Sequence, residues 1–259
     1  MKIAIFIHED YDFTFEFMGK LIPILLREHE VSGIHCFPNI QTKYKGAMIY
    51  LKYLEIFGLS VFLKLCFKGV VKRLTIIKSY IFNRRLYYSF SSMFSCYGIR
   101  KLNFKNPNDD EVISWVKENK IDIILLFVGY ILKDKILKAP RICILNKHSS
   151  ILPSNKGIFP IFWALIKNEP IGVTIHKVNG EIDGGEIVLQ KEYKKHEHWS
   201  VYDYYNLIFS DAPNLIVESI ELVKTNSLQK IKHDIIPSYH GLPTRKDYLN
   251  FKKMDFKFI

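Results

Sequence analysis

The feature that most constrains the fold is a largely apolar run from Ile121 to Val128. A run of this kind is typical of a central strand in a parallel sheet, where both faces are buried. Earlier in the chain, residues 3–8 and 30–37 read as strands, and residues 15–27 between them read as a helix. Alternating strands and helices predict an α/β fold with a mostly parallel sheet covered on both faces.

Further elements follow from local signals. Residues 101–104 read as a short strand, and residues 111–119 read as a helix whose N-terminus carries capping and acidic side chains from Asn108 to Glu111. Residues 201–225 predict an amphipathic helix that is interrupted near Pro213. We expect this last helix to complete the core.

Composition narrows the class of protein. A chain of 259 residues with 48% hydrophobic residues can bury a full core. No signal-peptide pattern precedes the first strand at Met1, so we expect a cytoplasmic protein. The four cysteines stand singly, and His196 and His198 have no third ligand nearby in the sequence. We therefore predict neither a disulfide framework nor a metal site.

Polar side chains follow the apolar residues 142–145. Asn146 and His148 are two positions apart, so on a strand they share one face near its C-terminal end, where open α/β sheets bind ligands. An Asn can donate to a developing oxyanion, a His can carry a proton, and Asp183 can hold that His charged. These residue types predict an acyl-transfer site without a protein nucleophile, in which a substrate amine attacks.

Four short motifs follow one another from this strand onward. They are N-x-H at Asn146 and His148, S-x-L-P-x-x-x-G at 150–157, G-V-T-x-H at 172–176, and D-x-G-x-I at 183–187. Each is weak alone, but in this order they resemble the formyltransferase family that uses N10-formyl-tetrahydrofolate. That family includes methionyl-tRNA, glycinamide ribonucleotide and sugar N-formyltransferases, and the looser resemblance covers roughly residues 1–195.

The resemblance implies a Rossmann-like core, no metal, and N10-formyl-tetrahydrofolate as the formyl donor. It also implies that Asn146, His148 and Asp183 are the catalytic residues. In the family, two loops hold the pterin, and the matching candidates here are Gly129, Tyr130, Ile131, Leu132 and Ile182. A merely tight turn between strand and helix is the alternative for residues 129–132.

The acceptor is predicted from what surrounds the core. Residues 8–13 contain no glycine-rich phosphate loop, which argues against a dinucleotide and against glycinamide ribonucleotide. Only 64 residues follow Lys195, whereas methionyl-tRNA formyltransferases carry a further basic domain. Residues 235–244 resemble the short hairpin of sugar N-formyltransferases. A nucleotide-linked amino sugar, with dTDP the favoured nucleotide, is therefore expected, for surface polysaccharide such as the O-antigen of lipopolysaccharide.

Several residues are candidates for contact with this acceptor or for support of the site. His176 is expected to be structural, in a position to support Asp183, and Phe159 and Trp163 are expected in the core. The acceptor candidates are Glu9, Tyr11, Lys156, Gly157 and Tyr239.

One segment carries most of the net charge of +11. Between Lys43 and Tyr88 ten basic residues face the single acid Glu55, a local balance of +9, and Lys64, Lys68 and Lys72 share one helical stripe. The segment has no uncharged run long enough to cross a bilayer. Three functions stay open for it: packing on the catalytic domain, contact with an anionic inner-membrane surface, and attraction of a nucleotide diphosphate.

These observations predict a catalytic domain over residues 1–195, with a basic helical insertion at about 43–92, and a C-terminal helix and hairpin extension over 196–259. A homodimer is compatible with the exposed aromatic residues, and a nucleic-acid partner is not expected. Two alternatives remain, namely formylation of another amine such as methionyl-tRNA, and a non-catalytic scaffold at a membrane surface.

Overall fold

A computed structural model describes residues 1–38, 40–41, 44–228 and 235–259. Lys43, where the predicted basic segment begins, and residues 229–234 of the predicted extension lie outside the described residues. The chain forms two compact units. The first comprises Met1–Ile40 with Cys66–Leu145, and the second comprises Gln41–Leu65 with Asn146–Ile259.

The first unit is built on parallel strands. β1 (Lys2–His8) pairs in parallel with β2 (Glu30–Phe37) and with β5 (Ile123–Phe127), and α1 (Thr14–Glu28) is the crossover between β1 and β2. Ile123 to Leu126 of β5 are buried, as expected of a central strand. The predicted strands and the predicted crossover helix are confirmed.

Three helices complete the first unit together with most of α3 (Leu59–Ile81). They are α4 (Phe90–Cys96), α5 (Asp110–Glu118) and α6 (Asp134–Leu137). α5 confirms the helix expected there. The strand expected over residues 101–104 is reduced to a single bridge between Lys101 and Ile34.

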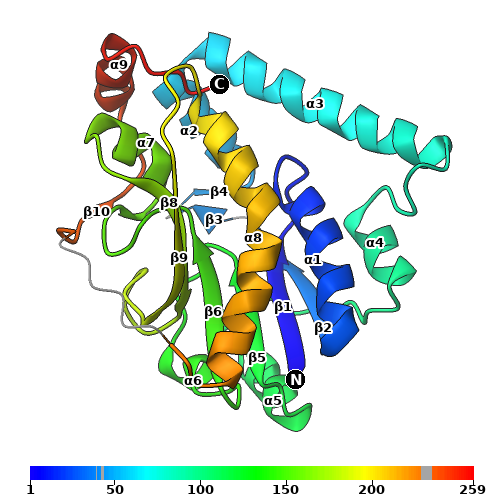
Figure 1. Cartoon of the computed structure of the whole chain (residues 1–259). Helices are drawn as coiled ribbons and strands as arrows, with labels where there is room; N and C mark the ends of the chain where they lie inside the picture. The colour runs from blue at the N-terminus through cyan, green and yellow to red at the C-terminus, as the bar shows by residue number, and fades with distance from the viewer. Residues whose placement is uncertain (39, 42–43, 229–234) are drawn as a thin grey trace. The chain divides into compact units, whose positions relative to one another are not determined.

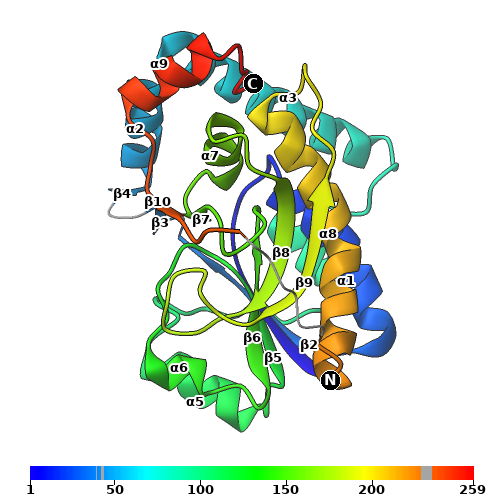
Figure 2. The ribbon, with the colours of Figure 1, turned by 60° about the vertical axis from the view of Figure 1, so that its left-hand side comes forward.

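The boundary between the two units falls within β6 (Cys143–His148), whose residues from Asn146 onward belong to the second unit. β8 (Ile171–Lys177) and β9 (Ile187–Tyr193) pair antiparallel, and α8 (Val201–Lys224) lies beside both strands (Figures 1 and 2). The six longer strands form one mostly parallel sheet in the order β2-β1-β5-β6-β8-β9, which confirms the predicted α/β class.

The expectation that a break near Pro213 interrupts α8 is wrong, because the helix is continuous from Val201 to Lys224. A proline in a helix removes one backbone hydrogen bond. Pro213 is itself buried, along with residues on both sides of it such as Ile208 and Ile216. Burial of this apolar face stabilises the helix enough to offset the missing bond.

Two helices that are far apart in the sequence pack together in the second unit. α2 (Ala47–Phe57) lies beside α9 (Arg245–Lys253) (Figures 1 and 2). The ring of Phe57 contacts those of Tyr248 and Phe258, and Arg245 donates to the Ile56 carbonyl at 3.0 Å. The basic segment expected to be helical contains α2, α3 and the start of α4.

Two short strand pairs remain. β3 (Ile40–Gln41) pairs with β4 (Tyr44–Lys45), and β7 (Lys156–Gly157) pairs in parallel with β10 (Tyr239–His240). The predicted C-terminal hairpin is not what residues 235–244 form, because β10 takes β7 as its partner. Among the described helices, none combines the length and the apolar character that crossing a bilayer requires.

Candidate functional site

Asn146 and His148 lie at the C-terminal end of β6, and both belong to the second unit. His148 is buried, with its Nε2 2.9 Å from the Asn155 carbonyl oxygen. A carbonyl only accepts, so Nε2 carries a proton and donates. The other ring nitrogen, Nδ1, faces Asp183 Oδ2 at 3.5 Å. The two residues that the sequence predicted to work together are thus adjacent.

Asp183 is held as a carboxylate. Its Oδ2 accepts a hydrogen bond from the Gly157 backbone N–H at 2.8 Å. Burial alone would raise the pKa of Asp183, but the nearby rings of His148 and His176 and the Gly157 N–H lower it to about 2. The side chain therefore stays ionised throughout the physiological pH range.

The protonation state of His148 differs from the expectation. Burial lowers the pKa of His148, and this outweighs the Asp183 carboxylate and the Asn155 carbonyl, which both favour the charged ring. The sequence predicted a His held protonated by Asp183. The structure favours a neutral ring at pH 7, with Nδ1 able to accept a proton beside a carboxylate.

His176, at the end of β8, connects two of the predicted catalytic residues. Its Nε2 lies 3.4 Å from Asn146 Nδ2 and 3.6 Å from Asp183 Oδ1, while its Nδ1 donates to the Lys177 carbonyl at 3.0 Å. A protonated Nε2 can donate to Asp183, and a neutral one can accept from Asn146. Sequence reasoning anticipated the support of Asp183 and missed the contact with Asn146.

A half-buried carboxylate, that of Glu169, orders the loop that holds His148. Glu169 Oε2 accepts from Ser154 Oγ at 2.5 Å and from Asn155 Nδ2 at 2.6 Å. Asn155 has a left-handed φ of 54°, and its N–H donates to Ser238 Oγ at 2.9 Å. These bonds fix the direction of the carbonyl that receives His148. Sequence reasoning missed Glu169, Asn155 and Ser238, and no local pattern marks them.

Gly157 is required by its backbone and by its neighbour. Its φ is 95°, and a Cβ at this position would lie 2.2 Å from the His240 carbonyl oxygen. The close approach comes from the pairing of β7 with β10, in which Tyr239 is the partner of Lys156. Three acceptor candidates, Lys156, Gly157 and Tyr239, are therefore brought together, and the Tyr239 side chain is 57% exposed.

Glu9 and Tyr11, the other two acceptor candidates, belong to the first unit. Glu9 is exposed just beyond β1. The Tyr11 ring packs against Phe15 and Phe90, and the Arg73 guanidinium lies 4.2 Å from its centroid. Burial raises the pKa of Tyr11. Tyr11 is thus a packing residue in this structure.

The loop after β5 contains the donor candidates of the first unit. Asn108 ties it in place, because its Nδ2 donates to the Ile131 carbonyl at 3.0 Å and its Oδ1 accepts from the Lys133 N–H at 2.7 Å. Leu132 is buried, whereas Ile131 is 67% exposed. A braced loop with an exposed apolar side chain fits contact with a flat ring.

The remaining donor candidates are also partly accessible. Gly129 is exposed and Tyr130 is half-buried, and burial raises the pKa of Tyr130. In the second unit, Ile182 is 43% exposed and immediately precedes Asp183.

Comparison with known families matches residues 84–220, just over half of the chain, to the model of the formyl transferase family. The chain belongs to the formyl transferase family. We call the linked polar residues described above the cluster around His148: Asn146, His148, Ser154, Asn155, Gly157, Glu169, His176, Asp183 and Ser238. The matched region includes all four motifs and every member of this cluster except Ser238.

Other formyl transferases are similar over part or most of the chain. The methionyl-tRNA formyltransferase of Borreliella burgdorferi (strain ZS7) is 34% identical over 123 residues, which is 46% of this chain and 39% of the relative. The chain thus spans about two fifths of that curated relative's length.

Two solved structures of formyl transferases share the fold. Glycinamide ribonucleotide transformylase 1 from Symbiobacterium toebii aligns with a TM-score of 0.60 and 17% identity, over 93% of this chain and 94% of that chain. An N-formyltransferase from Helicobacter canadensis, in complex with folinic acid and dTDP-3-aminofucose, aligns with a TM-score of 0.58 and 18% identity. The alignment covers 95% of this chain and 72% of that chain.

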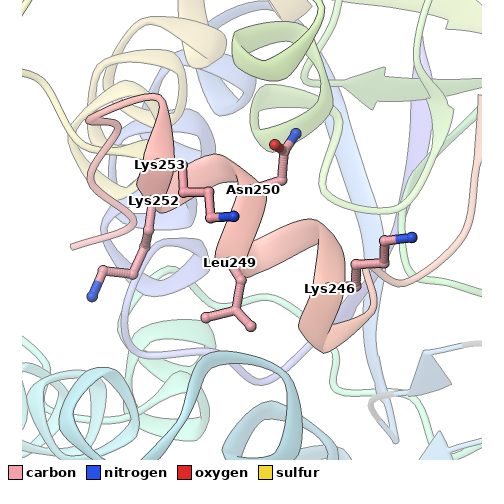
Figure 3. A pocket seen from close by; sticks show the side chains of 5 residues that line it. All are labelled: Lys246, Leu249, Asn250, Lys252 and Lys253. Atoms are coloured by element: carbon pink, nitrogen blue, oxygen red, sulfur yellow. The ribbon is translucent and has the colours of Figure 1, made fainter.

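A separate hollow of about 490 Å³ lies along α9, and its lining side chains project from successive turns of that helix (Figure 3). None of the residues predicted for the site lines it. The lining residues are Lys246, Leu249, Asn250, Lys252 and Lys253.

Proposed function

We propose that this formyl transferase moves a formyl group from N10-formyl-tetrahydrofolate to the amine of a nucleotide-linked amino sugar. One observation carries the reaction type: Asn146 lies beside His176, His176 beside Asp183, and Asp183 beside the buried ring of His148. The cluster provides an amide donor, a proton acceptor and a fixed negative charge. None of these four residues is a Ser, Cys or Lys, and in the proposed reaction the acceptor's own amine is the attacking group.

The chain's residues would act as follows. The donor, when bound, supplies the formyl carbon. Asn146 donates through Nδ2 to the formyl oxygen as negative charge develops there. His148 takes a proton from the attacking amine at Nδ1, and Asp183, 3.5 Å away, stabilises the charged ring until that proton passes to the departing nitrogen. The Asn155 carbonyl holds the ring through Nε2.

The pairing of β7 with β10 supports a nucleotide-linked acceptor. It places Tyr239, an exposed aromatic ring, next to Lys156, and the neighbouring Gly157 bonds to Asp183. An aromatic ring can stack on a base, and an ammonium can pair with a phosphate. The Helicobacter canadensis structure, described with dTDP-3-aminofucose, supports dTDP as the first nucleotide to test. By family analogy, the reaction would be a cytoplasmic step in making surface polysaccharide.

Methionyl-tRNA is the second candidate acceptor, because a methionyl-tRNA formyltransferase is the relative with 34% identity. One experiment separates the two acceptors. Purified protein is mixed with N10-formyl-tetrahydrofolate and with dTDP-, UDP- and GDP-linked amino sugars, or with charged initiator tRNA, and each acceptor's mass is followed. We expect one formyl group on one sugar nucleotide. Formylation of the tRNA alone would overturn the sugar proposal, and no product with any amine would overturn the reaction.

A further inference from the structure

The helix α3 exposes large apolar side chains along one face, and none of them is used by the proposed reaction. In the part of α3 that belongs to the first unit, Phe67 is 68% exposed, Val70 57%, Leu74 59% and Ile81 65%. Their spacings of three, four and seven residues put them on one side of a helix with 3.6 residues per turn. We call these four residues the α3 stripe.

The opposite side of α3 is the side that packs. Lys72 donates to the Asp12 carbonyl, and its ammonium lies 5.4 Å from the centre of the Phe13 ring. Ile76, four residues after Lys72, is only 2% exposed. Packing within the first unit therefore uses one face of the helix, and the α3 stripe lies on the other.

The charge around the stripe has one sign. From Leu59 to Tyr88 the chain has seven Lys and Arg residues and no Asp or Glu, a local charge of +7. Lys64, Lys78 and Arg84 are exposed, and Lys78 follows Leu74 of the stripe by four residues, about one helical turn. The apolar character continues past the helix, where Phe82 is 65% and Leu86 74% exposed.

We infer that the α3 stripe and its basic neighbours dock on an anionic lipid bilayer, with α3 lying in the plane of the interface. A helix with one apolar face, basic residues beside it and too little apolar length to span is the kind that binds membrane surfaces. Each Lys or Arg near an anionic surface adds attraction. A neutral partner would gain nothing from the charge.

A second copy of this chain fits the same face less well. A symmetric dimer built on α3 would bring together the exposed cations of two copies, Lys64, Lys78 and Arg84 of each, and residues 59–88 contain no acidic residue that could pair with them. Like charges brought together at an interface oppose association. Lipid headgroups with negative charge have the complementary sign and leave the apolar side chains a place to insert.

Flotation of the full chain with vesicles tests the inference. We expect binding to phosphatidylcholine vesicles that contain phosphatidylglycerol, much weaker binding to phosphatidylcholine alone, and release at high salt. The double variant Phe67→Ser/Leu74→Ser should bind at least about tenfold more weakly, because it removes two large apolar side chains that leave water on insertion. Lys64→Glu/Lys78→Glu should also weaken binding to anionic vesicles.

The matched control is Ile236→Ser/Leu249→Ser, which removes two exposed apolar side chains from the C-terminal part of the chain, 82% and 46% exposed. It should bind vesicles like the unaltered protein, and circular dichroism should show that all variants remain folded. The inference is overturned if the chain does not bind anionic vesicles. It is also overturned by binding that the α3 variants leave unchanged, or by a dimer in ultracentrifugation that these variants dissociate.

A fluorescence measurement tests the depth of insertion. With the natural tryptophans replaced by Phe, Leu74→Trp should shift its emission to the blue on anionic vesicles and be quenched by brominated acyl chains. Insertion of the stripe is contradicted if the tryptophan of Leu74→Trp, in the presence of anionic vesicles, is quenched by aqueous iodide and not by the brominated acyl chains. Formylation of a dissolved sugar nucleotide is assayed separately, so loss of the reaction and loss of membrane binding can be told apart.

Discussion

The cluster around His148 and the α3 stripe place their side chains in opposite environments. In the cluster, polar groups are buried or half-buried, and most are hydrogen-bonded to another polar group, as in the pairs Glu169–Asn155 and Asp183–Gly157. In the stripe, apolar groups such as Phe67 and Leu74 face solvent. Buried polar networks are costly unless they are satisfied, and exposed apolar faces are uncommon without a partner. Both regions depart from ordinary packing, and each departure points to a function.

The largest effect is expected on the cluster side of this comparison, from removal of the His148 ring or of the Asp183 carboxylate beside it. We expect His148→Ala and Asp183→Asn to lower turnover by about 100- to 1,000-fold, because each removes a group that stabilises charge in the transition state. The measurement is the rate of formylation in a single turnover, followed as the gain in mass of the acceptor. His198→Ala, which changes an exposed histidine, is the control and should stay active. Turnover near the normal rate in His148→Ala would remove His148 from the mechanism.

Gly157→Ala should disturb both the loop and the acceptor residues. A Cβ would lie 2.2 Å from the His240 carbonyl oxygen at a φ of 95°, so β7 and β10 must separate. Strain of this kind costs on the order of 1–3 kcal/mol. We expect a lower melting temperature and a larger KM for the sugar nucleotide. Gly241→Ala, where a Cβ meets nothing within 4 Å, is the matched control and should change neither quantity.

Glu169→Ala tests whether the half-buried carboxylate of Glu169 positions His148. The change leaves Ser154 Oγ and Asn155 Nδ2 without their shared acceptor, at a cost of about 1–3 kcal/mol in stability. We expect kcat to fall about tenfold, an effect smaller than that of losing a direct donor, with little change in KM. Glu169→Gln, which keeps an oxygen for the Asn155 amide, should recover most of kcat. Equal losses in both variants, or a change confined to KM, would argue against positioning.

The stability of the cluster should depend on pH in two windows. The pKa of His148 is lowered from its usual 6.5, so the unfolded chain binds a proton that the native chain does not, and stability falls as pH drops below about 6.5. The pKa of Asp183 is lowered from 3.8 to about 2, so its contribution is present above pH 4 and is lost as pH falls towards 2. Both losses can be measured by urea unfolding between pH 7 and pH 2. The loss of stability below about pH 6.5 should be absent in His148→Gln, and the loss between pH 4 and pH 2 should be absent in Asp183→Asn.

Sequence reasoning predicted the parts of the molecule that local patterns encode. The strands β1, β2 and β5 follow from apolar runs, and the adjacency of His148 and Asp183 follows from motifs at the ends of strands. The role of Glu169 could not be predicted, since its partners Ser154 and Asn155 are fifteen and fourteen residues away and are brought to it by tertiary packing. The neutral state of His148 also depends on burial, which a sequence motif does not report.

The pairing of β10 with β7 was beyond sequence reasoning for the same reason. The resemblance of residues 235–244 to the short hairpin of sugar N-formyltransferases implied a local hairpin, but Tyr239 pairs with Lys156, 83 positions earlier in the chain. The continuity of α8 through Pro213 was missed because proline's local effect was weighed without the burial on either side of it. In both cases, a long-range contact outweighed a local preference.

The smallest effect we predict separates the two faces of α3. Phe67→Ser/Leu74→Ser should change the free energy of unfolding by no more than about 1 kcal/mol, because exposed sites contribute within roughly 0.5 kcal/mol each. On the packed face of the same helix, Ile76 is 2% exposed, and Ile76→Ala should cost about 2–5 kcal/mol. Chemical denaturation without lipid measures both. A large loss in the double serine variant would mean that the chain itself covers the stripe. A small loss together with abolished vesicle binding would mean that the apolar side chains contribute to a contact outside the chain and not to its fold.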